Sequence, residues 1–550
     1  MGCELDTTAP SEAGVGGPPT WSLKPELEIL NGIPFLMYPQ RPHHLLDVLQ
    51  FAQRWGNRTY VVQRDRRVTF AQLLLGTHRT ASALADAGVR GSDRVLILGW
   101  SSLDWIINFW ACQVLGAVPV LGNAWWSAVE VGDALTLLDP AAVLADEPSS
   151  AKVPGGRLEL RWSTQGGVTQ AEMEGDPARN IYPRESHDES DPAVIIFTSG
   201  TSGRPKAVEL SHRSLLANLH MLLQMTRQLP QQLGAAVSEV ALHTGPLFHV
   251  GGSQMLLRTI ALGNTIVLPS GRFNPADVLE LIERHRVTRW SAVPTMVTRV
   301  LDHPDLQRRD ITSLTALTIG GSPIHAELLR RIGSELPNVK TGVPTGYGLT
   351  ENGGQATAAS GRDTLKHPGS AGFPLPCAEV SFQMRDDLPD AEILLRSPTQ
   401  MTGYIGVDES PIDADGWLHT GDLGRLDDEG RLWITGRAKD LILRGGENIA
   451  PAAVEQALSS IDGVVEAAVV GVPHPEFGEE VCAFVVVSGE LTADSLTRQL
   501  RGQIASFSVP SLWYVQTDPL PTNQTGKVDK LALAALARAA ADTKAEARPK

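Results

Sequence analysis

Short apolar runs alternate with amphipathic stretches over roughly the first 378 residues, and this alternation limits the fold more than any other feature. The amphipathic stretches have the 3.6-residue period of helices, whereas the apolar runs have the length of short buried strands. Strands separated by helices are typical of parallel βαβ units. Examples of the runs are residues 95–98, 143–145, 193–197 and 265–268, and examples of the helical stretches are 45–54, 70–87 and 276–285. The sequence therefore predicts an α/β fold.

The pattern changes after about residue 378. Shorter alternating runs, punctuated by Gly and Asp, indicate hairpins or a small barrel up to about residue 435. Residues from about 440 onward are expected to form a separate small α+β unit. Its expected elements are a helix at 452–459, strands at 464–470 and 482–487, and a terminal helix at 531–545.

Composition narrows the classes of partner. The 550 residues carry a formal net charge of −15, which disfavours nucleic acid and anionic membranes. Four widely spaced cysteines form no CxxC pair, so we expect no zinc ribbon, no disulfide framework and a cytoplasmic location. The N-terminus has no signal-peptide pattern. The segment 105–126 contains polar residues and a Gly-Ala-Val-Pro break, so we expect a buried helix, a turn and a strand instead of a transmembrane segment.

Residues 198–206, Thr-Ser-Gly-Thr-Ser-Gly-Arg-Pro-Lys, directly follow an apolar run. Exposed backbone N–H groups and hydroxyls suit a polyphosphate, and the lysine adds a positive charge. The glycine spacing is not that of a Walker A loop. Taken alone, the segment leaves open both a phosphate-binding loop and a flexible surface loop. The candidate phosphate ligands are Thr198, Ser199, Gly200, Thr201, Ser202, Gly203 and Lys206.

This loop resembles the phosphate-binding motif of the adenylate-forming superfamily, which includes acyl-CoA synthetases, luciferases and adenylation domains. Further motifs of the superfamily follow in its order between about residues 45 and 530. They are PLFH at 246–249, GGSP at 320–323, GYGLTE at 346–351, MTGY at 401–404, GWLHTGD at 416–422, GRAKD at 436–440, RGGENI at 444–449 and GK at 526–527. By these motifs the chain is identified as a member of the superfamily, of the acyl-CoA synthetase type.

The resemblance implies an AMP-forming ligase. It would couple a carboxylic acid to AMP, release pyrophosphate, and transfer the acyl group to coenzyme A, with ATP and Mg²⁺ as further requirements. Negative charge moves among the carboxylate, the α-phosphate and pyrophosphate in this reaction, so the site needs fixed cations and hydrogen-bond donors and must be closed to water. Lys527 is implied as the cation at the α-phosphate and the substrate carboxylate. Thr350 is implied at the phosphates, Glu351 at Mg²⁺, and His249 as the gate between the acid pocket and the phosphates.

The resemblance to the superfamily also implies the remaining contacts with the nucleotide. Tyr347 is implied at the adenine face, Asp422 at the ribose hydroxyls, and Arg437 at the sugar–phosphate side. The small residues implied along the nucleotide are Gly320, Gly321, Ser322 and Gly346.

The resemblance further implies that the small domain rotates, so that one site serves both steps. We predict a flexible leader at 1–20, a large domain at 21–437 with a β-rich subdomain at about 378–435, a hinge at 438–440, and a mobile C-terminal domain at 441–550. Lys439 is the expected hinge residue. The expected contacts to coenzyme A are Gly445, Gly446, Glu447 and Arg272.

The acid pocket is expected to be lined by His249, Gly251, Gly252, Val293, Met296 and Leu349. No Asp or Arg is evident in these segments to pair with a second charge, so we expect an apolar acid. A medium- or long-chain fatty acid is favoured, and an aryl or arylalkanoic acid is the alternative. An adenylation enzyme that loads a carrier protein, a luciferase-like oxygenase and a non-catalytic relative are the competing classes. The sequence leaves open whether the chain forms a homodimer.

Overall fold

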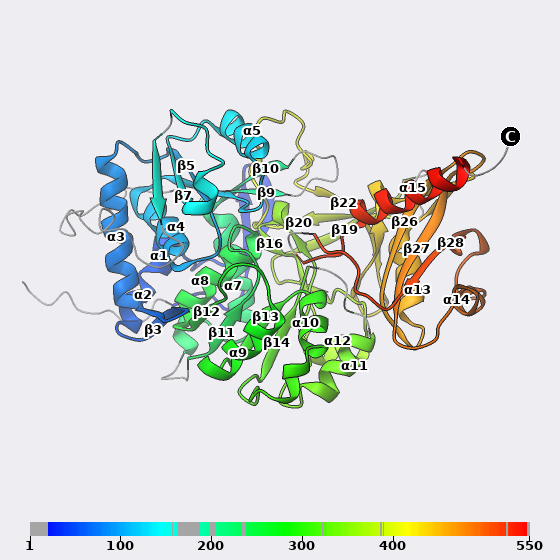
Figure 1. The fold of residues 1–550 in the computed structure, drawn as a ribbon. Coiled ribbons are helices and arrows are strands. Elements are labelled where there is room, and N and C mark those ends of the chain that lie inside the picture. The colour runs from blue at the N-terminus through cyan, green and yellow to red at the C-terminus, as the bar shows by residue number, and fades with distance from the viewer. Residues whose placement is uncertain are drawn as a thin grey trace, which may run out of the picture.

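The computed structural model describes residues 20–156, 158–162, 188–198, 205–233, 238–321, 324, 326–340, 342–385, 388, 390–523 and 526–546. The predicted leader therefore falls outside the described residues, apart from Thr20. Figure 1 shows a large body, blue to yellow along the chain, and a smaller C-terminal unit in orange and red. The predicted α/β fold with a small C-terminal domain is confirmed.

A seven-stranded sheet forms one layer of the large domain, in the order β21-β10-β9-β6-β5-β7-β8. Its central strands are parallel, whereas β9, β10 and β21 pair antiparallel at one edge. The strands are β5 (Arg94–Leu98), β6 (Val118–Gly122), β7 (Ala142–Asp146), β8 (Glu159–Trp162), β9 (Pro192–Thr198), β10 (Lys206–Ser211) and β21 (Gly403–Tyr404). The antiparallel β9–β10 pair places Thr198 opposite Lys206, at the two ends of the predicted phosphate loop.

A six-stranded sheet, in the order β14-β13-β11-β12-β3-β4, forms the second layer. All its neighbouring strands are parallel except β3 and β4. The strands are β3 (Thr59–Gln63), β4 (Arg66–Thr69), β11 (Val240–His243), β12 (Thr265–Leu268), β13 (Arg289–Ala292) and β14 (Ala316–Ile319). Because parallel strands end at the same edge of a sheet, the segments after β11, β13 and β14 lie together.

Helices cover these sheets, and a large apolar core lies between the layers. They are α1 (Leu45–Leu49), α2 (Phe51–Trp55), α3 (Phe70–Asp86), α4 (Leu103–Leu115), α5 (Ala128–Leu138), α6 (Glu147–Ser150), α7 (His212–Met225), α8 (Val250–Leu262), α9 (Pro275–His285), α10 (Pro294–Leu301), α11 (Ala326–Glu335) and α12 (Gly361–Lys366). Every residue of α4 is buried, and the helix ends at Gly116 in a left-handed conformation before β6 begins. The predicted buried helix, turn and strand are confirmed. Among the described helices none has the length and apolarity that crossing a membrane requires.

Short elements connect the large domain to its β-rich part. They are β1 (Glu26–Leu30), β2 (Ile33–Met37), β15 (Gly348–Leu349), β16 (Gly354–Gln355), β17 (Thr357–Ala358), β18 (Phe373–Pro374), and the 3₁₀ turns η2 (Pro230–Gln232), η3 (Pro304–Gln307) and η4 (Thr350–Asn352). Four antiparallel strands then form the expected β-rich part: β19 (Glu379–Gln383), β20 (Glu392–Arg396), β22 (Leu418–Leu426) and β23 (Leu432–Arg437).

The C-terminal unit is a five-stranded sheet with helices on both faces. Its elements are β24 (Ile442–Arg444), β25 (Glu447–Ile449), α13 (Pro451–Ser459), β26 (Val464–His474), β27 (Gly478–Val487), α14 (Ala493–Leu500), η6 (Ser506–Ser508), β28 (Leu512–Gln516) and α15 (Lys530–Glu546). One face of the sheet packs with α13 and α14, and the other packs with α15. The 3₁₀ turn η5 (Ala438–Asp440) joins this unit to β23 and spans the predicted hinge.

Candidate active site

Lys527 projects from the loop between β28 and α15 of the C-terminal unit and reaches the large domain. Its Cε lies 3.2 Å from where a Cβ on Gly321 would be, next to the end of β14. Gly526 has φ +80°, and its carbonyl accepts a hydrogen bond from Thr295 Oγ1. A Cβ on Gly526 would lie 3.1 Å from Val293 Cγ2, so a larger residue here would crowd this approach, and the positive φ also favours glycine. The structure therefore brings Lys527 to residues about 200 positions upstream.

The lysine is exposed as a whole, but its amine lies among charged groups. Burial of the amine lowers the Lys527 pKa first, and the positive charge of Arg437 lowers it further, while Asp422 opposes the fall. Lys527, Arg437 and Asp422 thus form one electrostatic group.

Asp422 is the centre of a hydrogen-bonded cluster and is only 3% exposed. Its Oδ2 accepts a 2.6 Å hydrogen bond from the Tyr347 hydroxyl, and its Oδ1 accepts from Arg437 Nε at 2.5 Å. Burial raises the Tyr347 pKa well above its ordinary value, and the neighbouring carboxylate adds to the rise. Tyr347 is therefore a neutral donor at physiological pH. Each Asp422 oxygen retains a lone pair for another donor.

A second cluster joins Glu351 to the phosphate-loop strands. Tyr404 donates from its hydroxyl to Glu351 Oε1 at 2.8 Å, and Lys206 Nζ lies over the Tyr404 ring at 4.5 Å from its centroid. Thr350 and Glu351 begin the η4 turn, and the Glu351 carbonyl accepts from the Met401 N–H. The residues of the phosphate loop itself, Ser199, Gly200, Thr201, Ser202 and Gly203, fall outside the described residues, as does Ser322.

Two histidines lie between β11 and α8. His249 is the N-cap residue of α8, and its Nε2 has no hydrogen-bond partner among the described residues. His243 ends β11, is 8% exposed, and has no partner at either ring nitrogen within the described part of the chain. Burial lowers both pKa values to about 4, and for His249 the charges of Lys527 and His243 add to the effect. Both imidazoles are therefore neutral near pH 7, and His249 is near both Lys527 and His243.

The predicted pocket residues divide into two groups. Val293 and Met296 pack against Gly526, and Gly251 has open space around its Cα. Gly252 is buried, and a Cβ there would meet the Leu247 backbone at 2.6 Å, so its space is filled by the chain. Leu349 ends β15, one residue before the η4 turn, and is partly buried.

The two remaining nucleotide glycines differ in surroundings. Gly320, like Gly251, has nothing within 4 Å of an added Cβ. A Cβ on Gly346 would lie 2.3 Å from the Thr357 carbonyl, so this glycine permits close strand packing.

The residues predicted to contact coenzyme A lie on the surface. Gly445 and Gly446 form the exposed turn between β24 and β25, both with positive φ, and Glu447 follows them. Arg272 is exposed in the loop between β12 and α9. Lys439 is exposed in the η5 turn, where a change in backbone angles would reorient the C-terminal unit.

Three residues of the site have contacts that the sequence motifs did not predict. Tyr404 closes a motif, yet its contact with Glu351 depends on the pairing of β21 with β10. His243 is a polar residue at the end of an apolar run, which is the signal that could have identified it. Thr295 contacts the Lys527 loop only across the domain boundary.

Asp422, Glu351 and Lys527, which the sequence motifs singled out, therefore all lie in or at the large domain, each with a defined set of neighbours. The AMP-binding enzyme family matches residues 48–405, and the AMP-binding enzyme C-terminal domain matches residues 453–527. The chain belongs to the AMP-binding enzyme family, as an AMP-forming acid–thiol ligase of the acyl-CoA synthetase type. The superfamily prediction is confirmed.

Relatives with known activities cover most of the chain. It is 33% identical over 512 residues to 3-[(3aS,4S,7aS)-7a-methyl-1,5-dioxo-octahydro-1H-inden-4-yl]propanoyl:CoA ligase of Mycobacterium tuberculosis, with 86% of this chain and 95% of that protein covered. It is 34% identical over 478 residues to feruloyl-CoA synthase of an Amycolatopsis species, with 84% and 92% covered.

A solved structure agrees with this placement. The o-succinylbenzoate CoA synthetase of Bacillus subtilis, in complex with its acyl-adenylate intermediate, superposes with a TM-score of 0.74 at 30% identity, covering 88% of this chain and 97% of that chain. The same enzyme has been solved with ATP and a magnesium ion, with a TM-score of 0.72 at 30% identity and the same coverage. ATP and coenzyme A are therefore the co-substrates of this chain, and Mg²⁺ fits the family.

Proposed function

We propose that this ligase activates an aryl or other ring-bearing alkanoic acid that carries an oxygen substituent. The observation that carries this choice is the buried imidazole of His243, which has no hydrogen-bond partner among the described residues and lies near the gate candidate His249. A neutral imidazole donates from one nitrogen and accepts at the other. A fatty acyl chain would leave both nitrogens unpaired at a substantial free-energy cost, whereas a hydroxyl or oxo group would supply a partner.

The position of His243 supports a role at the acid. Leu242, the preceding residue of β11, packs with Trp290 and Val297 on one face of the six-stranded sheet. Because successive side chains of a strand point to opposite faces, His243 lies on the other face, which is the side of α8. The relatives support the same substrate class, since their names specify a dioxo fused-ring propanoate, ferulate and succinylbenzoate. The aryl alternative therefore has more support than the fatty acid that the sequence favoured.

In this proposal Lys527 neutralises charge between the acid carboxylate and the α-phosphate as the acyl-adenylate forms. Asp422 accepts hydrogen bonds from the ribose hydroxyls, because Tyr347 and Arg437 fix its two oxygens while leaving lone pairs free. Arg437 supports the sugar–phosphate side, and Tyr347 borders adenine.

Glu351 suits Mg²⁺ carried by a nucleotide. It is a hard oxygen donor oriented by Tyr404, and the described residues contain no group of three or more His, Cys, Asp and Glu side chains arranged as a metal site. Mg²⁺ held by phosphates needs few protein carboxylates, and it would neutralise charge on pyrophosphate. We assign phosphate contacts to Thr350, Lys206 and the loop from Thr198 to Gly203.

The second step needs a different pose of the C-terminal unit. We propose that rotation about Lys439 withdraws Lys527 and brings the Gly445–Gly446 turn to the site, where pantetheine can run close to a backbone without side chains. Glu447 and Arg272 remain candidates for contacts with coenzyme A. The cytoplasmic location expected from the cysteine pattern stays a prediction.

A panel of acids tests the substrate class. The purified enzyme, ATP, Mg²⁺ and coenzyme A are combined with 3-phenylpropanoate, 3-(4-hydroxyphenyl)propanoate, octanoate or hexadecanoate, and AMP and acyl-CoA are measured. We expect the hydroxylated aryl acid to have the highest kcat/KM. His243→Leu should lower that value by about tenfold while sparing the unsubstituted acid, since a site that pairs a hydroxyl loses this discrimination when its partner is removed.

Other outcomes would contradict the proposal. A preference for hexadecanoate would restore the fatty-acid prediction. Formation of AMP without acyl-CoA would point to a carrier-protein acceptor, and formation of ADP would contradict adenylate chemistry altogether.

A further inference from the structure

The loop that carries Lys527 is held from two sides. On its own domain, the Leu520 N–H donates to Glu466 Oε2 on β26 at 3.1 Å. On the large domain, Arg299 Nη2 donates to Thr522 Oγ1 at 3.4 Å, and Thr295 Oγ1 donates to the Gly526 carbonyl. Thr295 and Arg299 are four residues apart on α10, so they share one face of the helix. That face lies against the loop.

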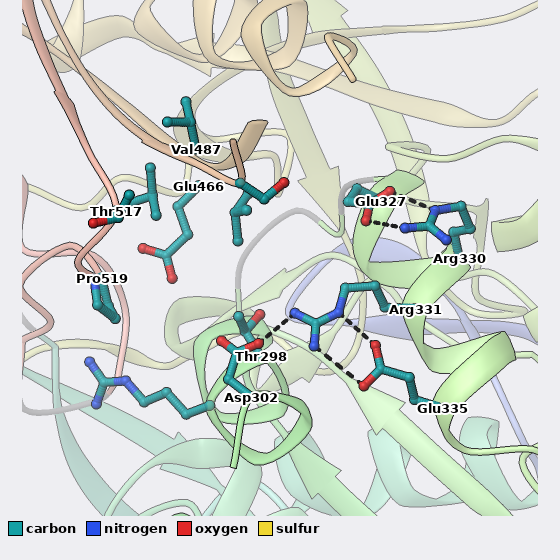
Figure 2. A pocket seen from close by; sticks show the side chains of 14 residues that line it. Thr298, Asp302, Glu327, Arg330, Arg331, Glu335, Glu466, Val487, Thr517 and Pro519 are labelled. Atoms are coloured by element: carbon teal, nitrogen blue, oxygen red, sulfur yellow. Dashed lines mark hydrogen bonds and ion pairs between the residues drawn. The ribbon is translucent and has the colours of Figure 1, made fainter. Parts of the chain in front are cut away.

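Arg299 and Glu466, which each take part in one of these contacts, line a cleft between the domains with a volume of about 390 Å³. Figure 2 shows Glu466 projecting into it from the C-terminal side, facing Thr298 and Asp302. On the large-domain side, Arg331 pairs with Asp302 and with Glu335, both at 2.8 Å, and Arg330 pairs with Glu327 of its own helix. The cleft is therefore lined by groups from α10, α11, β26 and the end of β27.

Arg299 differs from the other arginines of the cleft. Among the described residues, no carboxylate lies within ion-pair distance of its guanidinium, whereas Arg330 and Arg331 are paired. Its positive charge acts on Glu466 across the cleft and partly offsets the rise in the Glu466 pKa caused by burial. Both the hydrogen bond and the charge of Arg299 thus act on the C-terminal unit.

We infer that Thr295 and Arg299 are positioning residues, which hold the Lys527 loop in the pose that forms the acyl-adenylate and contribute nothing to thioester formation. This inference rests on the proposed roles of Lys527 and of rotation about Lys439. The contacts join two domains, so rotation of the C-terminal unit must break them. Interactions made in only one of two poses change the population of that pose.

Half-reactions measured separately test the inference. Thr295→Val removes the hydroxyl at similar volume, and Arg299→Ala removes the guanidinium. We expect the double variant to form acyl-adenylate about tenfold more slowly, which is the loss expected for about one net hydrogen bond involving a charged group. The KM for ATP should stay the same, because neither residue contacts the nucleotide. Thioester formation from synthetic acyl-adenylate should stay within about twofold of the unaltered enzyme.

Two further variants separate positioning from general damage. Arg330→Ala removes an arginine of the same cleft that pairs within its own helix, and it should change neither half-reaction. Arg299→Lys keeps the positive charge and should recover most of the adenylation rate. Equal losses in both half-reactions, no loss in the double variant, or an equal effect of Arg330→Ala would overturn the inference.

Lys527→Ala, measured in the same assays, distinguishes a failure of the positioning roles of Thr295 and Arg299 from a failure of the proposed role of Lys527. If it abolishes adenylate formation while the double variant is unaffected, the positioning roles of Thr295 and Arg299 are wrong and the role of Lys527 stands. If it leaves adenylate formation intact, the proposed role of Lys527 is wrong, and the loop has no catalytic group for α10 to position.

Discussion

Replacing Asp422 by Asn tests the proposed nucleotide site at the carboxylate that accepts hydrogen bonds from both Tyr347 and Arg437. The carboxylate is 3% exposed and accepts from Tyr347 at 2.6 Å and from Arg437 at 2.5 Å. It retains one lone pair on each oxygen for a ribose hydroxyl. An amide has only one oxygen, so in either orientation its NH₂ group faces a donor that the carboxylate accepted.

The magnitude follows from these contacts. In the proposed site, Asp422→Asn would remove at least one charge-assisted hydrogen bond to ribose, and such bonds contribute roughly 1.5–3 kcal/mol. That corresponds to about tenfold to hundredfold weaker binding of ATP. Because the Arg437 side chain is 48% exposed, its ion pair adds little to this figure.

The KM for ATP in pyrophosphate exchange, supported by calorimetric titration with ATP, measures the effect. Tyr347→Phe is the matched control. It removes a hydrogen bond worth about 1 kcal/mol but leaves the carboxylate charge and frees a lone pair, so the KM for ATP should rise by no more than about fivefold. An unchanged KM in Asp422→Asn, or an equal effect of Tyr347→Phe, would show that Asp422 does not accept hydrogen bonds from ribose.

Further predictions concern the lysine loop and the metal. Gly526→Ala combines a left-handed backbone, which costs about 1–2 kcal/mol for other residues, with a contact at 3.1 Å, so adenylate formation should fall several-fold. Gly430→Ala shares the positive φ without a neighbour within 4 Å and should leave that rate unchanged. Tyr404→Phe should raise the Mg²⁺ concentration for half-maximal adenylation about fivefold, since Glu351 loses an orienting donor worth about 1 kcal/mol; a Mg²⁺ titration with no shift would count against this site. The proposed role of Lys527 needs its protonated form, and its pKa is lowered, so the rate should decline at a lower pH than an ordinary lysine, with pKa 10.5, would give. A pH–rate profile that stays flat up to pH 10.5 would contradict this.

The sequence predicted the parts of the site that depend on local pattern. These parts include the motifs around Glu351 and Lys527, whereas the adjacency of the segments after β11, β13 and β14 depends on how these strands pair, which the sequence did not predict. The contacts of Thr295 could not be predicted, since they arise from docking of a domain more than 200 residues later in the chain. Gly252 could not be assigned for a different reason. A glycine that leaves room for a ligand and a glycine that packs against the backbone of Leu247 look the same in the sequence.

The role of Lys527 is best examined by measuring the two half-reactions separately in Lys527→Ala. We expect adenylate formation to fall by at least about 100-fold, because in the proposed mechanism Lys527 is a preorganised charge at the reacting groups. Thioester formation from synthetic acyl-adenylate should stay within about threefold, because Lys527 is withdrawn in that step. Equal loss of both half-reactions, or full adenylate formation without the lysine, would show that Lys527 does not act in adenylate formation alone.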